Sequence, residues 1–452
     1  MRRLSVIDGI FLRTHQGMGT PIALQGLWRT ADLVDPARLD GLHNALRRGP
    51  LGRRVVRSGV PGARDRWQIN TRAHPLDMAS APLGVDEILP WADGRGAGLD
   101  PRVGPGWRLA AAPLTDGGTV VALTCSHVLA DARGLVIAVE EALATAGNGT
   151  NPEPGPTRGN RAGGTAQPAG DPESDWADAA ETCATVLTGT ARAARTALRQ
   201  ARAGERLRLR RRPRAMPAET RSREIPAEMG GAPVVPVGLQ VPALVVRCPG
   251  REWDRVAAAS GGTPNSLFIW FVANTLWSTG FPERRIVASL PVDTRDEPRI
   301  DNDLAMTEIV VAPGDDPGEI RAKSRAAYER RISSPGGLPE EFLHLVPDRV
   351  AYLLSRGAGE RDILCSNIGP IPAPLHALGP HECTGVAARA IHPGLTYARR
   401  PRTRLSGYLC LFRGDYLLTL ASLDPARVPD AAELHRYIVD TARRIGLPVV
   451  PW

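Results

Sequence analysis

The sequence predicts an α/β protein with two lobes joined by a long crossover. Strand-like and helix-like patterns alternate over residues 1–146 and again over 236–452. Between these regions, twelve of the 26 residues from 147 to 172 are glycine or proline, and none is a large apolar residue. Such a stretch cannot bury enough apolar surface to offset its ordering entropy, so we expect a linker there. The predicted organisation is a first lobe over 1–146, a flexible crossover with a basic helix over 147–235 and a second lobe over 236–452.

Capping and turn signals predict the elements of the first lobe. Asp35 followed by Pro36 indicates a helix start, because a carboxylate suits the N-cap and proline suits the first helical position. Two strands are expected over 107–114 and 119–127, joined by an Asp-Gly-Gly turn. Apolar residues at helical spacing over 135–143 then predict a helix directly after the second strand.

The crossover contains one long predicted helix, residues 174–204, with Ser174 as its N-cap. One face carries an apolar stripe, made of Trp176, Ala180, Cys183, Leu187, Ala194 and Leu198. A second face carries arginines in the C-terminal half, where the helix dipole favours positive charge: Arg192, Arg195, Arg199 and Arg202. This basic segment has three interpretations: a solvated helix face, a surface for an acidic carrier protein or coenzyme A phosphates, or a contact with an anionic membrane.

The second lobe repeats the alternation of helices and strands. Helix starts are predicted at Thr263, Asp316 and Asp430, where a capping residue precedes or adjoins proline. Strands are expected over 285–292, 306–311, 362–368 and 385–391, followed by a hairpin of 407–412 and 416–422.

Composition excludes several classes of protein. The formal charge is +8, but residues 192–214 alone contribute +9, so the rest of the chain sums to about −1 and offers no general nucleic-acid surface. The six cysteines are scattered and form no CxxC pair, as expected of reduced thiols rather than of a zinc site. The N-terminus has no sustained apolar signal segment, and the apolar run 267–277 is too short to span a bilayer. We therefore expect a cytoplasmic protein without stable membrane insertion.

The strongest chemical signal is His127, which ends an apolar strand and is followed four residues later by Asp131. Ends of strands and the loops after them are where α/β proteins place their sites. An imidazole there can act as a general base near neutral pH. The alternative is a histidine that only satisfies backbone groups in a turn, and spacing alone does not decide between the two.

The segment around His127 resembles the HHxxxDG motif of the chloramphenicol-acetyltransferase-like superfamily, which includes peptide-synthetase condensation domains and wax ester synthase/diacylglycerol acyltransferases. Further short motifs match in the same order, nearest to the wax-synthase branch. They are the LSxxDxxF-like start at 4–11, the PLWR-like strand at 106–109, the GxTxND-like helix start at 262–266, the PVxxR-like strand at 291–295 with Asn302 as the following GN, and the SNxxGP-like strand at 366–370.

The resemblance implies two chloramphenicol-acetyltransferase-like lobes, arranged as a pseudo-dimer with a tunnel at their interface. It also implies direct acyl transfer, in which His127 takes the proton of a hydroxyl or amine acceptor that attacks a thioester. In the family the motif aspartate is structural and pairs with an arginine, which corresponds here to Asp131 and Arg295, and the pair is expected to be bidentate. Asn265, Ser366 and Asn367 correspond to substrate-binding positions of the family.

Three departures from the family pattern bear on these expectations. Ser126 replaces the first histidine of the pair, Ala132 replaces the glycine after the aspartate, and Ser266 replaces the aspartate of the ND pair. Because successive strand residues point to opposite faces, Ser126 and His127 should not share a role. The loss of the first histidine therefore leaves the proposed base in place.

The expected donor is acyl-CoA or the phosphopantetheine of an acyl carrier protein, with no cofactor bound, and the acceptor is a small molecule. A carrier protein is the expected macromolecular partner, and specialised metabolism the expected setting. The alternatives are a wax ester or diacylglycerol synthase and a relative of the same fold without acyl transfer, either a binding module or a catalyst of cyclisation or isomerisation. A nucleophile at Cys125 and a metal site at His376, His381 and Cys383 are less favoured.

Overall fold

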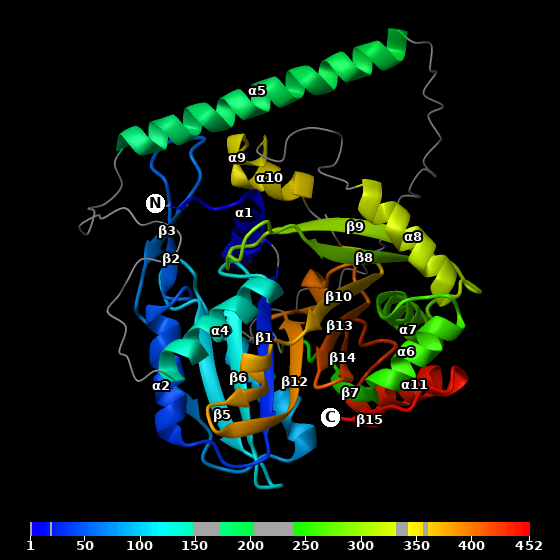
Figure 1. The fold of residues 1–452 in the computed structure, drawn as a ribbon. Coiled ribbons are helices and arrows are strands. Elements are labelled where there is room, and N and C mark those ends of the chain that lie inside the picture. Colours follow the sequence, from blue (N-terminus) through cyan, green and yellow to red (C-terminus); the bar gives the residue numbers. More distant parts are fainter. Residues whose placement is uncertain (1, 19, 148–171, 203–237, 331–341, 356–359) are drawn as a thin grey trace, which may run out of the picture.

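The computed structural model describes residues 2–18, 20–147, 172–202, 238–330, 342–355 and 360–452. Two mixed sheets stand side by side, each with helices packed against it (Figure 1). The first sheet is built mainly from the first third of the chain and the second from the last half, so the prediction of two α/β lobes is confirmed. A tunnel between them stays a prediction.

The first sheet has six strands in the order β11-β12-β1-β6-β5-β4. Their bounds are β1 (Ala23–Thr30), β4 (Asp77–Met78), β5 (Trp107–Pro113), β6 (Thr119–Ser126), β11 (Ala377–Leu378) and β12 (His381–Ile391). A separate pair of strands, β2 (Arg53–Val56) and β3 (Arg66–Ile69), lies beside it. The helices of this lobe are α1 (Val6–Arg13), α2 (Pro36–Arg48), α3 (Ile88–Asp93) and α4 (Ala132–Gly147).

The second sheet has seven strands in the order β15-β7-β14-β13-β10-β8-β9. Their bounds are β7 (Ala243–Pro249), β8 (Ile286–Asp293), β9 (Leu304–Val311), β10 (Ile363–Pro370), β13 (Leu405–Phe412), β14 (Asp415–Ser422) and β15 (Val450–Pro451). Its helices are α6 (Gly250–Ala259), α7 (Pro264–Ser278), α8 (Pro317–Arg330), α9 (Phe342–Leu345), α10 (Asp348–Ser355) and α11 (Ala431–Arg444). Two large apolar clusters are buried: one lies mainly in the first lobe and also includes residues of β7, β13 and β14, and the other lies in the second lobe, where α7 supplies Phe268 and Phe271.

Two strands from the C-terminal part of the chain, β11 and β12, join the first sheet, which the sequence division at residue 236 does not anticipate. β12 pairs antiparallel with β1 over its length, and appears as the orange strand beside blue β1 in Figure 1. Arg389 on β12 is buried and donates to Gln25 Oε1 at 2.8 Å, and it forms an ion pair with Asp93 at 2.7 Å. The crossing strand is therefore tied to the first lobe by a buried charge as well as by the ladder.

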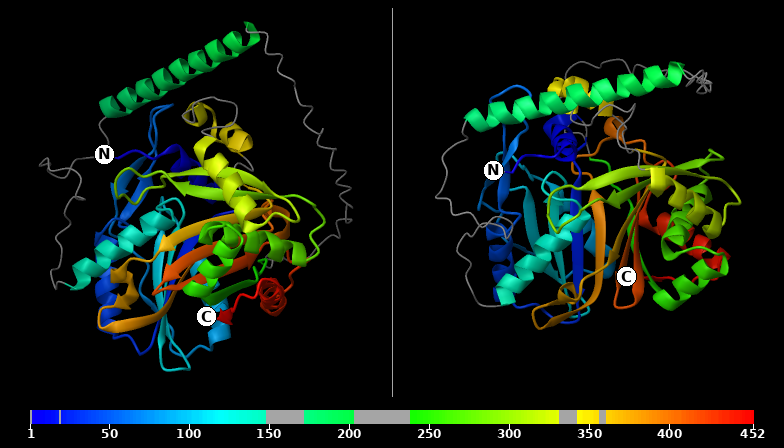
Figure 2. Two further views of the ribbon diagram at one scale, coloured as in Figure 1. Left: turned by 45° about the vertical axis from the view of Figure 1, so that its right-hand side comes forward. Right: turned by 45° about the horizontal axis from the view of Figure 1, so that its top comes forward.

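The crossover helix is present, but its first residue and its buried face differ from the prediction. α5 (Pro172–Arg202) begins two residues before Ser174, whose hydroxyl instead accepts from Arg3 at 3.2 Å. Asp175 and Asp178 bind the helix to the first lobe, through Arg3 at 2.6 Å and Arg64 at 2.6 Å. Both views in Figure 2 place α5 along one edge of the molecule.

The described part of the predicted apolar stripe of α5, from Trp176 to Leu187, faces solvent rather than the protein. Trp176 and Leu187 are 64% and 69% exposed, whereas Ala179 and Val186 are buried. The reason is that the buried face is set by the two aspartates and their arginine partners, not by the largest apolar side chains. The linker residues 148–171 and the side chains of the four arginines from Arg192 lie outside the described part of the chain.

The loop between β8 and β9 reaches from the second lobe onto the start of α4 in the first. Gly134, in the first turn of α4, lies against the backbone of Ile300 in that loop, and a Cβ at residue 134 would come within 2.2 Å of the Ile300 carbonyl oxygen. Only glycine fits this approach without a shift of one backbone or the other.

Gly134→Ala should therefore lower the free energy of unfolding by about 1–3 kcal/mol, the usual cost of overpacking. The matched control is Gly94→Ala, since Gly94 also has a helical φ of −61° and a Cβ there would have no neighbour within 4 Å. Chemical denaturation of both variants measures the difference. Equal stability of the two proteins would contradict the tight contact between loop and helix.

Candidate active site

His127 lies at the first residue after β6, at the end of the first sheet. Its backbone N–H donates to Ile22 O at 2.9 Å, which extends the pairing of β6 with β1 by one residue. The side chain is partly buried. Ser126 is only 3% exposed, and its hydroxyl accepts from Val128 N at 3.4 Å. The residue in place of the motif's first histidine therefore serves the turn.

The His127 ring is held by a residue of the second lobe. Its Nδ1 lies 3.0 Å from Oδ1 of Asn302, in the loop between β8 and β9. The Nδ2 of Asn302 faces acceptors only: Asp8 Oδ1 at 2.8 Å, His127 O at 2.8 Å and Val128 O at 3.3 Å. This network assigns the amide orientation, so Oδ1 must accept from the ring. His127 consequently carries its proton on Nδ1 and a free lone pair on Nε2.

Asp8 holds Asn302 from the other side. It is fully buried on α1, and its second oxygen accepts from Ser5 N at 2.8 Å while Asp8 N donates to the Ser5 hydroxyl at 3.0 Å. This reciprocal pair is a capping box, which satisfies two free N–H groups at the helix start. Burial raises the pKa of Asp8 to about 6, against the hydrogen bonds from Asn302 and Ser5 that lower it.

Phe11 fixes the plane of the His127 ring. The two rings stack with their centroids 3.8 Å apart and an interplanar angle of 16°. Asp8 and Phe11 are three residues apart on α1, so both project toward the same side of the helix. The opening motif of the sequence therefore acts on His127 through two different contacts.

The protonation state of His127 suits a base. Burial lowers its pKa below the usual 6.5, and this outweighs the nearby Asp131 carboxylate and the Asn302 contact, which raise it. The ring is then neutral at pH 7. Its Nε2 accepts no hydrogen bond from any described residue. This nitrogen is also not completely shielded from solvent. That atom is the one available to take a proton.

Asp131 and Arg295 form the expected ion pair, with Arg295 Nη2 2.6 Å from Asp131 Oδ1. Both side chains are almost completely buried. The contact uses one guanidinium nitrogen and is not bidentate as predicted, because Asp131 also accepts from Gly134 N at 2.8 Å and from Asp303 N at 3.0 Å. The carboxylate thus joins the start of α4 to the β8–β9 loop.

The three expected substrate-binding residues lie in the second lobe, away from this hydrogen-bonded cluster. Asn367 donates to Asn265 Oδ1 at 3.0 Å, and Asn265 donates to the Tyr328 hydroxyl at 3.3 Å. Ser366 is partly buried on β10. No hydrogen bond between described residues connects these three side chains with His127.

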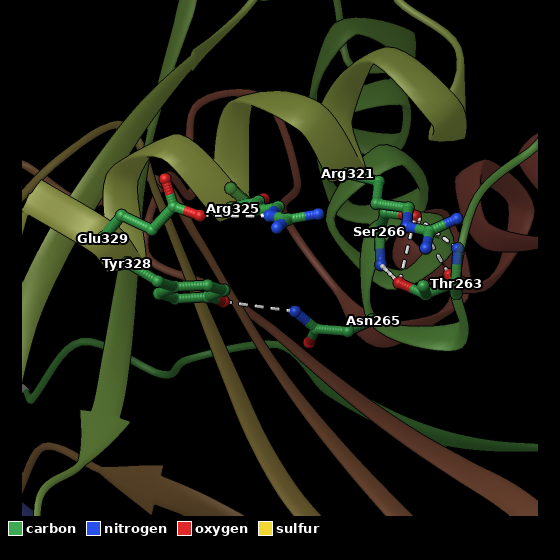
Figure 3. A pocket seen from close by; sticks show the side chains of 8 residues that line it. Thr263, Asn265, Ser266, Arg321, Arg325, Tyr328 and Glu329 are labelled. Carbon is green, nitrogen blue, oxygen red and sulfur yellow. Dashed lines mark hydrogen bonds and ion pairs between the residues drawn. The ribbon is translucent and has the colours of Figure 1, made fainter.

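A pocket of about 550 Å³ opens beside Asn265, at the N-terminus of α7 (Figure 3). α8 supplies Arg321 and Arg325 to its wall. Arg325 pairs with Glu329 at 3.0 Å, whereas Arg321 contacts only the Gly261 carbonyl oxygen, at 3.4 Å, among the described residues. Ser324, also in the wall, is 5% exposed and its hydroxyl has no partner. Arg321 thus gives the pocket one cationic side chain that no carboxylate of the described residues neutralises.

The other chemical candidates have different surroundings. Burial raises the pKa of Cys125 to about 12, which makes it a poor nucleophile. His381 bonds to Asp32 at 2.9 Å and to Asp35 N at 3.3 Å, and His376 bonds to Ile371 O at 3.0 Å. Within the described ranges, no group of three or more His, Cys, Asp or Glu side chains could hold a metal ion. In the same ranges no helix combines the length and apolarity needed to cross a membrane.

Sequence reasoning placed Asp8, Phe11 and Asn302 in motifs but gave them no role. Their shared role depends on a contact between residues almost three hundred positions apart, which no local pattern carries. A fourth residue near the site, His392, was missed altogether. The available signal was a histidine directly after the apolar strand β12, followed by proline.

No protein-family model matches the chain, and no curated protein sequence matches it. Solved structures do. Over its full length the chain resembles 99% of the first condensation domain of the calcium-dependent antibiotic synthetase, in complex with a substrate analogue, at 16% identity and a TM-score of 0.57. It covers 42% of a longer nonribosomal peptide synthetase chain, at 17% identity and a TM-score of 0.53.

Two further matching structures are named for reactions other than peptide condensation. A wax ester synthase/diacylglycerol acyltransferase from Marinobacter aquaeolei VT8 is matched over its whole length and 98% of this chain, at 14% identity and a TM-score of 0.53. An epimerization domain from tyrocidine synthetase B is matched over 96% of its length and 98% of this chain, at 11% identity and a TM-score of 0.52. At these identities the likeness establishes architecture, not reaction: the chain has the two-lobed, chloramphenicol-acetyltransferase-like fold of condensation domains.

Proposed function

We propose that the protein is an acyltransferase that joins a thioester-bound acyl group to a hydroxyl or amine acceptor, with His127 as the general base. The observation that supports this most is the ring of His127, which Asn302 holds with the proton on Nδ1 and with Nε2 free. A base with a fixed tautomer, partly exposed at the end of a sheet in this fold, fits direct attack of the acceptor on the donor.

The proton transfer balances without any other group. Nε2 of His127 takes the proton of the acceptor hydroxyl or amine as the acceptor attacks the thioester carbonyl carbon. When the carbon–sulfur bond of the tetrahedral intermediate breaks, the leaving thiolate takes that proton back from His127. The imidazolium that exists between the two steps is favoured by the Asp131 carboxylate, which raises the pKa of His127.

The donor in this proposal is acyl-CoA or an acyl group on the phosphopantetheine of a carrier protein. Both carry phosphate, and the pocket beside α7 offers Arg321 to such a group, whereas Arg325 is paired with Glu329. The acceptor is a small molecule. A cytoplasmic role in specialised metabolism, with a carrier protein as partner, fits the resemblance to the condensation domain of an antibiotic synthetase.

A second candidate is proton transfer without acyl transfer, such as isomerisation of a carrier-bound substrate. The similarity to an epimerization domain and the replacement of the motif's first histidine by Ser126 favour it. A lipid acyltransferase is a variant of the first proposal, favoured by the wax-synthase-like opening motif. Product analysis distinguishes them, because isomerisation releases no thiol.

His127→Ala should lower kcat by about 10²–10⁴-fold, the range for loss of a positioned general base. The assay is thiol release from a panel of acyl-CoA and acyl-N-acetylcysteamine thioesters, with alcohols and amines as acceptors. Because burial lowers the pKa of His127, the wild-type kcat/KM should hold down to below pH 6.5 and then fall as the ring protonates. Full turnover in His127→Ala would rule out the base mechanism.

Two controls separate chemistry from folding. His435→Ala, on α11 of the second lobe, should leave turnover unchanged. Asp131→Asn should reduce turnover and also lower the free energy of unfolding by about 3 kcal/mol, since it removes one partner of a buried ion pair. His127→Ala should lower the free energy of unfolding less, by about 1–2 kcal/mol, since it removes the Phe11 stacking and the hydrogen bond to Asn302 but leaves no buried charge unpaired.

Arg321→Gln tests the donor assignment. Losing an exposed charged contact to phosphate should raise the KM for acyl-CoA about two- to tenfold and leave the KM for acyl-N-acetylcysteamine, which has no phosphate, unchanged. Arg255→Gln, which removes a surface arginine paired with Glu252 on α6, is the matched control. Equal effects of Arg321→Gln on both donors would place the phosphates elsewhere.

A further inference from the structure

A second imidazole stands in register with His127 across the end of the first sheet. Ala23 of β1 pairs with Ser126 of β6 on one side and with Ile391 of β12 on the other. His127 directly follows Ser126 and His392 directly follows Ile391, so each lies one residue beyond the pairs formed with Ala23, next to Ile22. The hydrogen bond from His127 N to Ile22 O confirms the first of these pairings.

Residues directly opposite one another in a sheet project to the same face. His127, Ile22 and His392 therefore form a row on one face, and all three side chains are partly exposed. The preceding row, Ser126, Ala23 and Ile391, projects to the other face and is buried. Two strand spacings separate the histidines, so their Cα atoms lie roughly 10 Å apart. A carbonyl group of a bound donor that lay between the two rings would be within reach of both.

The His392 ring is neutral, and it has no hydrogen-bond partner among the residues that the structure describes. Burial, together with the smaller effect of the neighbouring His127, lowers its pKa to about 4. Its ring nitrogens are not completely shielded from solvent. At neutral pH the ring thus offers one N–H donor to whatever occupies the space between the two histidines.

A hydrogen-bond donor in this position would stabilise the negative charge that forms on the thioester carbonyl oxygen, which His127 does not do as the general base. Attack on a thioester turns the carbonyl oxygen into an oxyanion, and donors placed at that oxygen usually supply a large share of the rate. A neutral imidazole is suited to the task because it polarises the carbonyl without giving up its proton.

We propose that His392 is a second catalytic residue, which donates a hydrogen bond to the thioester carbonyl oxygen as the acceptor attacks. This inference rests on the proposed acyl transfer. His127 moves the proton from acceptor to leaving thiolate, and His392 keeps its own proton throughout, so the two rings have different roles despite their common origin at the end of one sheet. The crossing of β12 into the first sheet is what brings the second ring to the site.

The test compares His392→Leu with His392→Gln and His392→Asn, which keep an N–H donor near Nε2 or Nδ1 of the original ring. The probe is thiol release from octanoyl-CoA and octanoyl-N-acetylcysteamine with the alcohol and amine acceptors used for His127→Ala. His392→Leu should lower kcat about 10²–10³-fold with little change in KM, the range for loss of one oxyanion donor. One of the two amides should recover kcat to within about tenfold of wild type, and melting temperatures should stay unchanged.

The outcomes separate this inference from the function on which it rests. If His127→Ala loses turnover while His392→Leu keeps it, the acyltransfer mechanism stands and the role of His392 is wrong. Equal losses in the Leu, Gln and Asn variants, or a rise in KM at constant kcat, would also overturn it. A wild-type protein that releases thiol from none of the donors overturns the proposed function, and this inference with it.

Discussion

The rest of the site depends on the hydrogen bonds of the Asn302 side-chain amide. It lies in the β8–β9 loop of the second lobe and joins Asp8 on α1 to His127 after β6. Each of its polar atoms is occupied, so one residue fixes the ring tautomer, the position of α1 and the turn that follows β6. The neighbouring ion pair of Asp131 with Arg295 ties the same loop to α4. A displacement of one lobe relative to the other would break these contacts and release the ring.

The burial of the Asp8 carboxylate lowers the stability of the folded protein at neutral pH, and this indicates a functional reason for keeping the residue. Its pKa is raised from 3.8 to about 6, so between these values the folded protein binds more protons than the unfolded chain. This contribution to stability is therefore present at low pH and lost as pH rises through about 6, which leaves a deficit of roughly 3 kcal/mol at neutral pH. An apolar residue would avoid that deficit but could not hold the Asn302 amide. Sites often retain such a residue at the expense of stability.

The sequence allows the two-lobe architecture, most elements and His127 to be predicted, because alternating patterns and capping residues are local signals. The Asp131–Arg295 contact was also anticipated, but only through resemblance to a family. Three features could not be found this way. β12 joins the other lobe's sheet through its register with β1, α5 is oriented by ion pairs rather than by its apolar stripe, and His392 reaches the site only through that strand crossing. Each depends on long-range pairing, which periodicity does not encode.

The most direct test of this arrangement is the protonation state of the two His127 ring nitrogens, measured by nitrogen-15 NMR at pH 7.5 and assigned with His127→Gln. The Asn302 contact predicts a single tautomer with the proton on Nδ1 and a bare Nε2. Asn302→Leu, which removes the acceptor, should yield a mixture of tautomers. A wild-type ring protonated on Nε2, or one that exchanges between tautomers as freely as in the variant, would contradict the claim that Asn302 prepares His127 as the base.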